Sequence, residues 1–214
     1  MHPNPFRQTR FLLSVDHPRD LPPDTGAEVA IIGRSNVGKS SLLNALCEQR
    51  ALARVSRTPG RTQQIVVFEI AEQQRFLDLP GFGYAAVSRA VRSRWEVTLP
   101  VLLEQRAALC GLLLVTDARA PLKAEEHELL QWCAASHMPC LVALNKADKL
   151  GNAAAQLAWR ALNSALAAVT GLNGTAILSS VTKGQGLEAI RAELQALLGR
   201  NSRRKLKEGP GFKP

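Results

Sequence analysis

The octapeptide GRSNVGKS, Gly33–Ser40, is the feature that most limits how this chain can fold. It matches the pattern GxxxxGK[ST] and directly follows the apolar run EVAII at 28–32. Glycines at these positions let backbone N–H groups wrap around phosphate oxygens, and the helix that follows adds the positive end of its dipole. The motif therefore predicts a strand, a phosphate-binding loop and a helix that begins near Lys39.

The rest of the chain alternates strand-like and helix-like segments. Apolar runs predict strands at 111–117, 140–145 and 174–180, and the runs at 65–70 and 73–78 predict a hairpin around Ala71–Glu72. Amphipathic segments predict helices at 88–106, 123–136, 152–169 and 186–198, with Pro100 kinking or splitting the first. Together they predict a doubly wound α/β fold: a mostly parallel six-stranded sheet with helices on both faces and ligands at the strands' carboxyl ends.

Composition divides the chain into three parts. Residues 1–26 contain several prolines and predict an extended arm, residues 27–199 carry the alternating pattern, and residues 200–214 form a basic, flexible tail. With 46% hydrophobic and 21% charged residues over 214 positions, the chain has the composition of a folded globular protein. The apolar stretch at 11–15 is too short for a signal peptide, and no run is long enough to span a membrane, so we expect a cytoplasmic location. No long apolar stripe is left over for a dimer seam, so we expect a monomer.

The chain is strongly basic, with 27 Lys and Arg residues against 18 Asp and Glu residues and a net charge of +9. Such a charge favours a polyanionic partner, with nucleic acid as the leading class, because each neutralised phosphate releases counterions. A basic surface that serves only solubility is the alternative.

The four cysteines are Cys47, Cys110, Cys133 and Cys140, and no two of them form a CxxC pair. We expect buried or incidental thiols ahead of a structural zinc site.

Residues of the phosphate loop and of two further segments are expected to contact the phosphates and Mg²⁺. Lys39 is expected to reach the β- and γ-phosphates, and the Ser40 hydroxyl to bind Mg²⁺. Asp78 ends a predicted strand in the sequence DLPG, where its carboxylate can hold Mg²⁺ through water and the Gly81 N–H can sense a γ-phosphate. Thr62 is the candidate for a second Mg²⁺ hydroxyl, with Thr58 as the alternative.

The tetrapeptide NKAD, Asn145–Asp148, follows another predicted strand and indicates which nucleotide base is bound. A carboxylate at Asp148 can accept hydrogen bonds from the ring N–H and the exocyclic amine of guanine, a donor pair that adenine lacks. The stem of Lys146 is expected to cover one face of the base, Asn145 to brace the loop, and the residues around Ser180 to lie over the guanine carbonyl.

The candidates fall into three overlapping sets. Those with a catalytic role are Lys39, Thr62 and Gly81, and those for Mg²⁺ are Ser40, Thr62 and Asp78. The nucleotide-binding candidates are Gly33, Arg34, Ser35, Asn36, Val37, Gly38, Lys39, Ser40, Gly60, Arg61, Thr62, Gln63, Gln64, Asp78, Leu79, Pro80, Gly81, Asn145, Lys146, Ala147, Asp148, Leu178, Ser179 and Ser180.

Taken together, these residues resemble the EngB (YihA/YsxC) family, in the translation-factor-like superclass of P-loop GTPases. The resemblance covers about 11–198, and its most specific segments are SRTPGRTQ (56–63), DLPGFGYA (78–85) with Trp95, and TDARAPLK (116–123). It implies a bacterial cytoplasmic protein that binds GTP and GDP, assists assembly of the large ribosomal subunit and is needed for normal division and septation.

Two positions bear on GTP hydrolysis. Many GTPases orient the attacking water with a glutamine directly after DxxG, but this chain has Phe82 there, so we expect slow intrinsic hydrolysis. Arg57, Arg61 or Arg89 could supply an arginine finger. Asn36 suggests another route, because GTPases with asparagine at this position are often stimulated by K⁺.

Residues 54–64 and 79–95 are the expected switch segments, ordered with GTP and mobile with GDP. Each carries three arginines, which are Arg54, Arg57 and Arg61 in the first and Arg89, Arg92 and Arg94 in the second. Basic side chains on such segments would make affinity for ribosomal RNA depend on the bound nucleotide, unless they form only a solvated basic face. Trp95 could stack on a base or pack in the core.

Two other functions remain open from the sequence. One is a small-molecule kinase or ATPase on the same fold, against which NKAD argues. The other is a GTPase whose main partner is a division protein, with RNA binding incidental.

Overall fold

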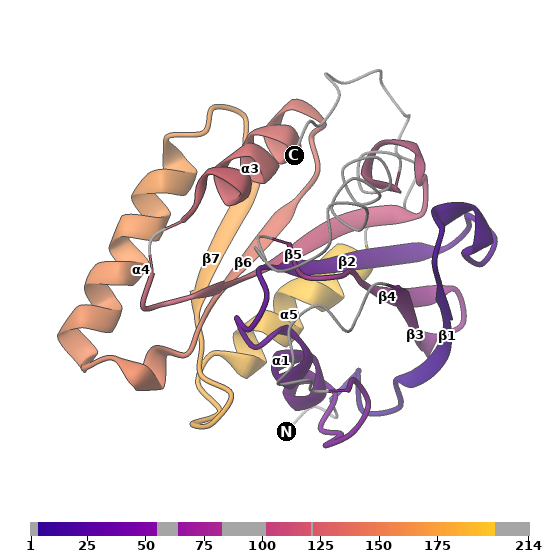
Figure 1. Cartoon of the computed structure of the whole chain (residues 1–214), viewed down its shortest axis with the longest axis horizontal. Coiled ribbons are helices and arrows are strands. Elements are labelled where there is room, and N and C mark those ends of the chain that lie inside the picture. The colour runs from indigo at the N-terminus through magenta and orange to yellow at the C-terminus, as the bar shows by residue number, and fades with distance from the viewer. Residues whose placement is uncertain (1–3, 55–63, 83–101, 121, 200–214) are drawn as a thin grey trace.

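The computed structural model describes residues 4–54, 64–82, 102–120 and 122–199. In them, one seven-stranded sheet runs in the order β1-β3-β4-β2-β5-β6-β7 (Figure 1). The strands are β1 Arg10–Val15, β2 Ala27–Gly33, β3 Ile65–Ala71, β4 Gln74–Asp78, β5 Leu109–Asp117, β6 Cys140–Asn145 and β7 Gly174–Leu178. The helices are α1 Lys39–Leu46, α3 Ala124–Ala135, α4 Asn152–Ala167 and α5 Leu187–Leu198, with 3-10 turns at Pro18–Asp20 and Ala147–Lys149. No helix in these residues has the length and apolarity needed to cross a membrane.

The predicted α/β class is confirmed, but the sheet has seven strands rather than six. The additional strand, β1, lies within the proline-containing arm and pairs antiparallel with β3 at the edge of the sheet. Its side chains do not alternate cleanly between core and solvent, and Phe11 and Leu12 are 56% and 38% exposed. Hydrophobic periodicity therefore gave no signal for β1, which is defined by its pairing with β3.

Most predicted elements lie within two residues of their expected bounds. The hairpin of β3 and β4 turns at Glu72–Gln73, one residue later than predicted, and β7 ends at Leu178 rather than Ser180. Most of the helix predicted at 88–106, including Pro100, lies outside the described residues, although 102–105 are helical. All four cysteines are buried, as expected.

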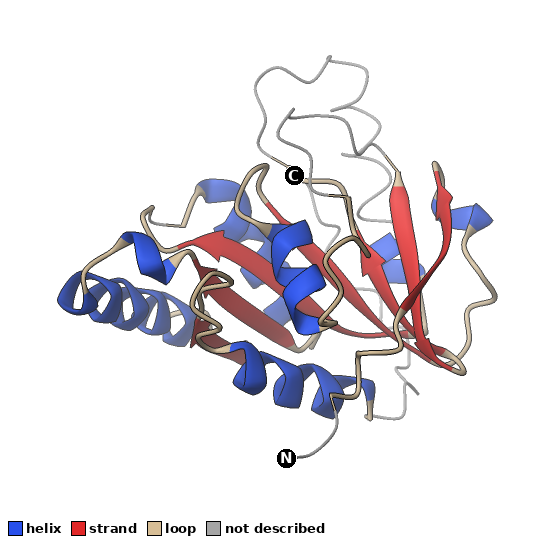
Figure 2. Cartoon of the chain, turned by 90° about the horizontal axis from the view of Figure 1, so that it is seen from below, coloured by secondary structure: helices blue, strands red, loops and turns tan. Residues whose placement is uncertain are grey.

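Helices cover both faces of the sheet, which gives three layers (Figure 2). Helices α1 and α5 pack on one face, where Leu42, Leu46 and Leu194 join one apolar core. Helices α3 and α4 pack on the other, where Leu130 and Leu162 join a second core. Strand β2 lies between these cores and all seven of its residues are buried, as expected for a central strand covered on both sides.

Strands β4, β2, β5, β6 and β7 are parallel, so their carboxyl ends meet at one edge of the sheet. The antiparallel strands β1 and β3 extend the sheet beyond β4. Loops after parallel strands gather at this edge, which is where doubly wound folds bind ligands.

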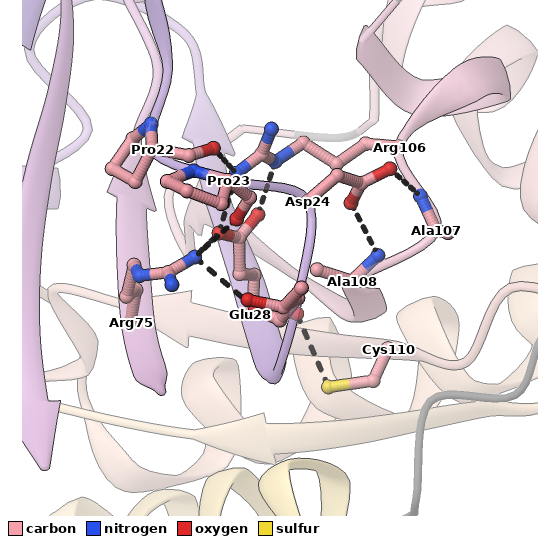
Figure 3. A network of polar contacts seen from close by, with 10 residues as sticks. Pro22, Pro23, Asp24, Glu28, Arg75, Arg106, Ala107, Ala108 and Cys110 are labelled. Atoms are coloured by element: carbon pink, nitrogen blue, oxygen red, sulfur yellow. Dashed lines mark hydrogen bonds and ion pairs between the residues drawn. The ribbon is translucent and has the colours of Figure 1, made fainter. Parts of the chain in front are cut away.

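The amino end of β2 is held by a buried ionic cluster (Figure 3). Glu28 is completely buried, and its carboxylate accepts hydrogen bonds from Arg75 of β4 and from Arg106, which donates through Nε and, at 2.8 Å, through Nη2. Both guanidinium groups also donate to backbone carbonyls of the arm, Arg106 to Pro22 and Arg75 to Pro23. The cluster thus joins β2, β4, the arm and the chain before β5.

Glu28 should therefore be essential for stability. Because Glu28→Ala leaves two buried guanidinium groups without their carboxylate, we expect it to lower the free energy of unfolding by about 3–5 kcal/mol. Equilibrium urea unfolding measures this directly. The matched control is Glu69→Ala, which removes a carboxylate paired with the exposed Arg10 and should cost less than about 1 kcal/mol. Equal losses in the two variants would show that the buried cluster has no special role.

Candidate nucleotide-binding site

The phosphate-loop motif runs from the end of β2 into the first turn of α1. Two of its glycines have no room for a side chain. A Cβ on Gly33 would lie 2.4 Å from the Val115 carbonyl oxygen, and one on Gly38 would lie 2.5 Å from Asn145 Nδ2. Gly38 also has a φ of +97°, and Asn36 a φ of +64°, in the left-handed region that glycine and asparagine tolerate best. The loop therefore packs tightly against β5 and against the last residue of β6.

Lys39 and Asp78 face each other across this loop. The Lys39 ammonium donates a hydrogen bond to Asp78 Oδ1, and the two side chains are only 10% and 5% exposed. Asp78 is the last residue of β4 and is in register with Ile31 of β2. Ser40 lies next to Lys39 in the first turn of α1. A carboxylate and a hydroxyl are hard oxygen donors, the kind that Mg²⁺ prefers, so these two residues fit such an ion.

The segment after Asp78 runs beside the phosphate loop. Phe82 N donates to the Gly33 carbonyl at 3.3 Å, and Ser35 N donates to the Phe82 carbonyl at 3.2 Å. These bonds bring Gly81 so close that a Cβ on it would lie 3.1 Å from Ser35 N. Phe82, the residue after Gly81, packs partly against the core. Its side chain is apolar and offers no polar group at this position.

The NKAD segment is linked to the phosphate loop and to the loop after β7. Asn145 Nδ2 donates to the Val37 carbonyl at 3.0 Å, and Lys146 Nζ donates to the Asn36 carbonyl at 2.5 Å. Ala147 N donates to the Ser179 carbonyl at 3.0 Å. Asn145 thus braces the loop in the way its motif suggests, and three separate loops form one surface.

Asp148 has a partner that the motifs did not suggest. The Ser180 hydroxyl, which is fully buried, donates to Asp148 Oδ1 at 2.6 Å. This hydrogen bond is the main reason why the pKa of Asp148 lies below its ordinary value. The carboxylate is therefore charged and held in one orientation at neutral pH, as a double acceptor for guanine requires.

Two other polar atoms at this end of the site lack partners. Asn145 Oδ1 and Ser179 Oγ are buried and make no hydrogen bond with the described residues. A buried polar atom without a partner costs about 1–3 kcal/mol, and such atoms are frequent where a ligand binds.

A pocket of about 360 Å³ lies beside the phosphate loop. Its lining includes Arg34, Ser35, Asn36 and Lys146, which the motifs identified. The lining also includes Asp117, Arg119 and Ala120, which lie in the segment TDARAPLK (116–123) but were not among the nucleotide-binding candidates. The signal for Asp117 was its place at the end of a predicted parallel strand, where the other site residues also lie.

Of the remaining candidates, Leu79 and Pro80 are buried directly after β4, and Leu178 is the partly buried last residue of β7. Gln64 is described and lies beside the edge of the sheet, where its Nε2 donates to Asp16 Oδ2 at 3.3 Å. The others lie outside the described residues; they are Thr58, Gly60, Arg61, Thr62, Gln63, the arginines Arg57, Arg89, Arg92 and Arg94, and Trp95.

Two comparisons of the sequence with known proteins bear on the family. Residues 28–146 match the family model described as 50S ribosome-binding GTPase. The chain is 46% identical over 191 residues to the probable GTP-binding protein EngB of Enterobacter sp. (strain 638), covering 89% of this chain and 91% of that protein.

Two solved structures share the fold. A crystal structure of a probable GTP-binding protein engB matches with a TM-score of 0.63 and 24% identity, over 80% of this chain and 98% of that one. An Era variant from Aquifex aeolicus bound to GDP·AlF4⁻ matches with a TM-score of 0.59 and 27% identity, over 87% of this chain and 59% of that one.

The contact between Ser180 and Asp148 predicts a pH effect on nucleotide affinity. If Asp148 accepts from guanine, as its motif predicts, it must be ionised, and nucleotide affinity is lost as the pH falls through its pKa. Ser180→Ala removes the main interaction that lowers this pKa. We expect about 3- to 10-fold weaker GDP binding at pH 7, the scale of one hydrogen bond, and a further loss on acidification that begins at higher pH than in the wild type.

Titration of fluorescent GDP between about pH 4 and pH 7 tests this. The control is Ser136→Ala, which removes a serine hydroxyl that is hydrogen bonded to a helix carbonyl away from the site. Parallel pH profiles for Ser180→Ala and the wild type would contradict the assignment.

Proposed function

The chain belongs to the EngB family of P-loop GTPases, and from that premise we propose that it is a GTP-dependent switch that assists assembly of the large ribosomal subunit. In this proposal it hydrolyses GTP slowly to GDP and phosphate, and its affinity for the subunit or its precursor depends on the bound nucleotide. It works in the cytoplasm as a monomer, and its loss impairs division and septation, as the family resemblance implies.

The distribution of charge carries this proposal. The described residues, which we call the scaffold, contain 16 basic and 16 acidic side chains and so carry no net charge. The net charge of +9 therefore falls entirely on the remaining positions, and every basic residue among them lies in the segments 55–63, 83–101 and 200–214. Two of these segments overlap the proposed switches at 54–64 and 79–95, and the third is the basic tail. Attraction to rRNA phosphates would thus be concentrated on segments that respond to nucleotide and on the tail.

Roles for individual residues follow from the geometry of the site. Gly33–Ser40 would bind the phosphates through backbone N–H groups, with Lys39 against the β- and γ-phosphates. Ser40 and Asp78 would hold Mg²⁺, together with Thr62 from the segment that is not described. The ion, when bound, neutralises charge on the phosphate oxygens. Asp148 would select guanine.

Hydrolysis should be slow because Phe82 offers no group to orient water. We expect a rate on the order of 10⁻³ s⁻¹ or less for the protein alone, the scale of GTPases that act without an activating partner. Faster turnover would need polar groups from one of the basic segments or from the ribosomal subunit.

Binding to purified large ribosomal subunits tests the proposal. We expect tighter binding with a non-hydrolysable GTP analogue than with GDP, and a steep fall in affinity as salt rises from about 50 to 200 mM. Replacing three basic residues with glutamine in one charged segment should reduce the slope of log K against log salt by roughly two, because each lost phosphate contact removes about 0.7–0.9. The switch variant changes Arg89, Arg92 and Arg94, and the tail variant changes Arg203, Arg204 and Lys205.

The matched control changes three exposed arginines of the neutral scaffold, Arg7, Arg10 and Arg19, whose side chains are 76%, 74% and 81% exposed. It has the same net charge as the other two variants, and we expect it to bind like the wild type. If the control variant loses as much affinity for the subunit as the switch variant does, a role for particular segments is contradicted. Affinity that does not depend on nucleotide would contradict the switch.

We also propose that K⁺ stimulates hydrolysis through the Asn36 side chain. Because Asn36 has a positive φ, an asparagine could be needed here for backbone conformation alone. Asn36→Gly distinguishes a K⁺ site from a need for backbone conformation alone, since it keeps the conformation and removes the side-chain amide. We expect faster GTP hydrolysis in KCl than in NaCl for the wild type and equal rates for Asn36→Gly. Equal rates in the wild type would exclude the K⁺ site.

A further inference from the structure

Two residues of the pocket have no role in the motifs that bind phosphate, metal or base. Asp117 is the last residue of β5 and pairs in register with Asn145 of β6, so its carboxylate emerges next to the NKAD segment. Arg119 follows two residues later. Its guanidinium donates to both carboxylate oxygens of Asp117, from Nε at 2.9 Å and from Nη2 at 2.7 Å.

The same carboxylate also binds Lys146. The Lys146 ammonium donates to Asp117 Oδ2 at 2.9 Å and to the Asn36 carbonyl at 2.5 Å. It is thus held between an acceptor on β5 and an acceptor on the phosphate loop. Arg119, Asp117, Lys146 and Asn36 form a continuous chain of polar contacts along one side of the pocket.

The ion pair between Asp117 and Lys146 is less exposed to solvent than an ordinary surface ion pair. The side chains of Asp117 and Lys146 are only 15% and 25% exposed, so water screens their attraction less than at the surface. Burial by itself disfavours the charged carboxylate, but the hydrogen bonds from Arg119 and Lys146 outweigh it and hold the pKa of Asp117 well below its ordinary value. The carboxylate therefore stays charged at every pH at which the protein is expected to function.

The geometry points to Asp117 as a positioning residue for nucleotide affinity: it fixes the Lys146 ammonium against the Asn36 carbonyl, and Arg119 orients the Asp117 carboxylate for this task. A lysine side chain loses conformational entropy when it is ordered. Because Asp117 and Asn36 already order Lys146, a base that packs on the lysine stem meets a preformed wall. This inference rests on the proposed binding of guanine nucleotides at this site.

A double-mutant cycle tests whether Asp117 acts through Lys146. Asp117→Asn removes the charge at nearly constant shape, and Lys146→Met removes the ammonium but keeps an apolar stem. We expect Asp117→Asn to weaken the binding of both GDP and GTP about 10-fold. In the Lys146→Met background, Asp117→Asn should have almost no further effect, because the ammonium that it positions is gone.

Steady-state and single-turnover kinetics separate positioning from general damage. Lys146 lies at the base end of the pocket, so Asp117→Asn should raise KM for GTP about 10-fold and leave the single-turnover rate at saturating GTP within about 2-fold of the wild type. Arg119→Ala changes a side chain that is 51% exposed. It should weaken GDP binding about 3-fold and should have no effect in the Lys146→Met background. It answers the same question if Asp117→Asn does not fold.

The matched control is Arg10→Ala, which removes an arginine that likewise donates from Nε to a carboxylate, that of Glu69, away from the site. It should leave nucleotide affinity unchanged. Unchanged GDP affinity in Asp117→Asn, or additive effects of Asp117→Asn and Lys146→Met, would overturn the inference while wild-type binding upholds the proposed function. A wild-type protein that does not bind guanine nucleotides would overturn both.

Discussion

Burial of β2 at the centre of the sheet is the constraint on which the rest of the structure depends. The strand is covered on both faces and paired on both sides, so its backbone has no freedom to shift. Its amino end carries Glu28, whose carboxylate is paired with two buried arginines. Its carboxyl end continues directly into the phosphate loop. This buried strand therefore positions the backbone N–H groups of the loop that we propose binds phosphate.

The parallel strands beside β2 supply the remaining parts of the site. Asp78, Asp117 and Asn145 each end such a strand, and Ser179 follows the end of another. Hydrogen bonds then join the loops: Asn145 to Val37, Lys146 to Asn36 and Ser180 to Asp148. Hydrogen bonds thus connect the base end of the site to its phosphate end. For this reason we expect a change at Asp117 to alter nucleotide affinity.

Sequence patterns predicted the features that have a local physical cause. The glycines of the phosphate loop and the buried parallel strands follow from short-range rules, and both appear at the expected positions. Strand β1 was not predicted, because an exposed edge strand between prolines has no hydrophobic period and depends on its pairing with β3. The contacts of Asp117 with Lys146 and of Ser180 with Asp148 depend on the register of neighbouring strands, which residue spacing alone does not reveal.

The competition of nucleotides for the purified protein tests the central claim most directly. GTP, ATP and xanthosine nucleotides are each titrated against bound fluorescent GDP, on the wild type and on Asp148→Asn. We predict displacement of GDP from the wild type by GTP but not by ATP, and in Asp148→Asn a loss of guanine affinity or a shift toward xanthine, whose base offers an acceptor where guanine has its amine. Equal displacement by ATP and GTP would contradict guanine recognition by Asp148 and favour a kinase or ATPase on this fold.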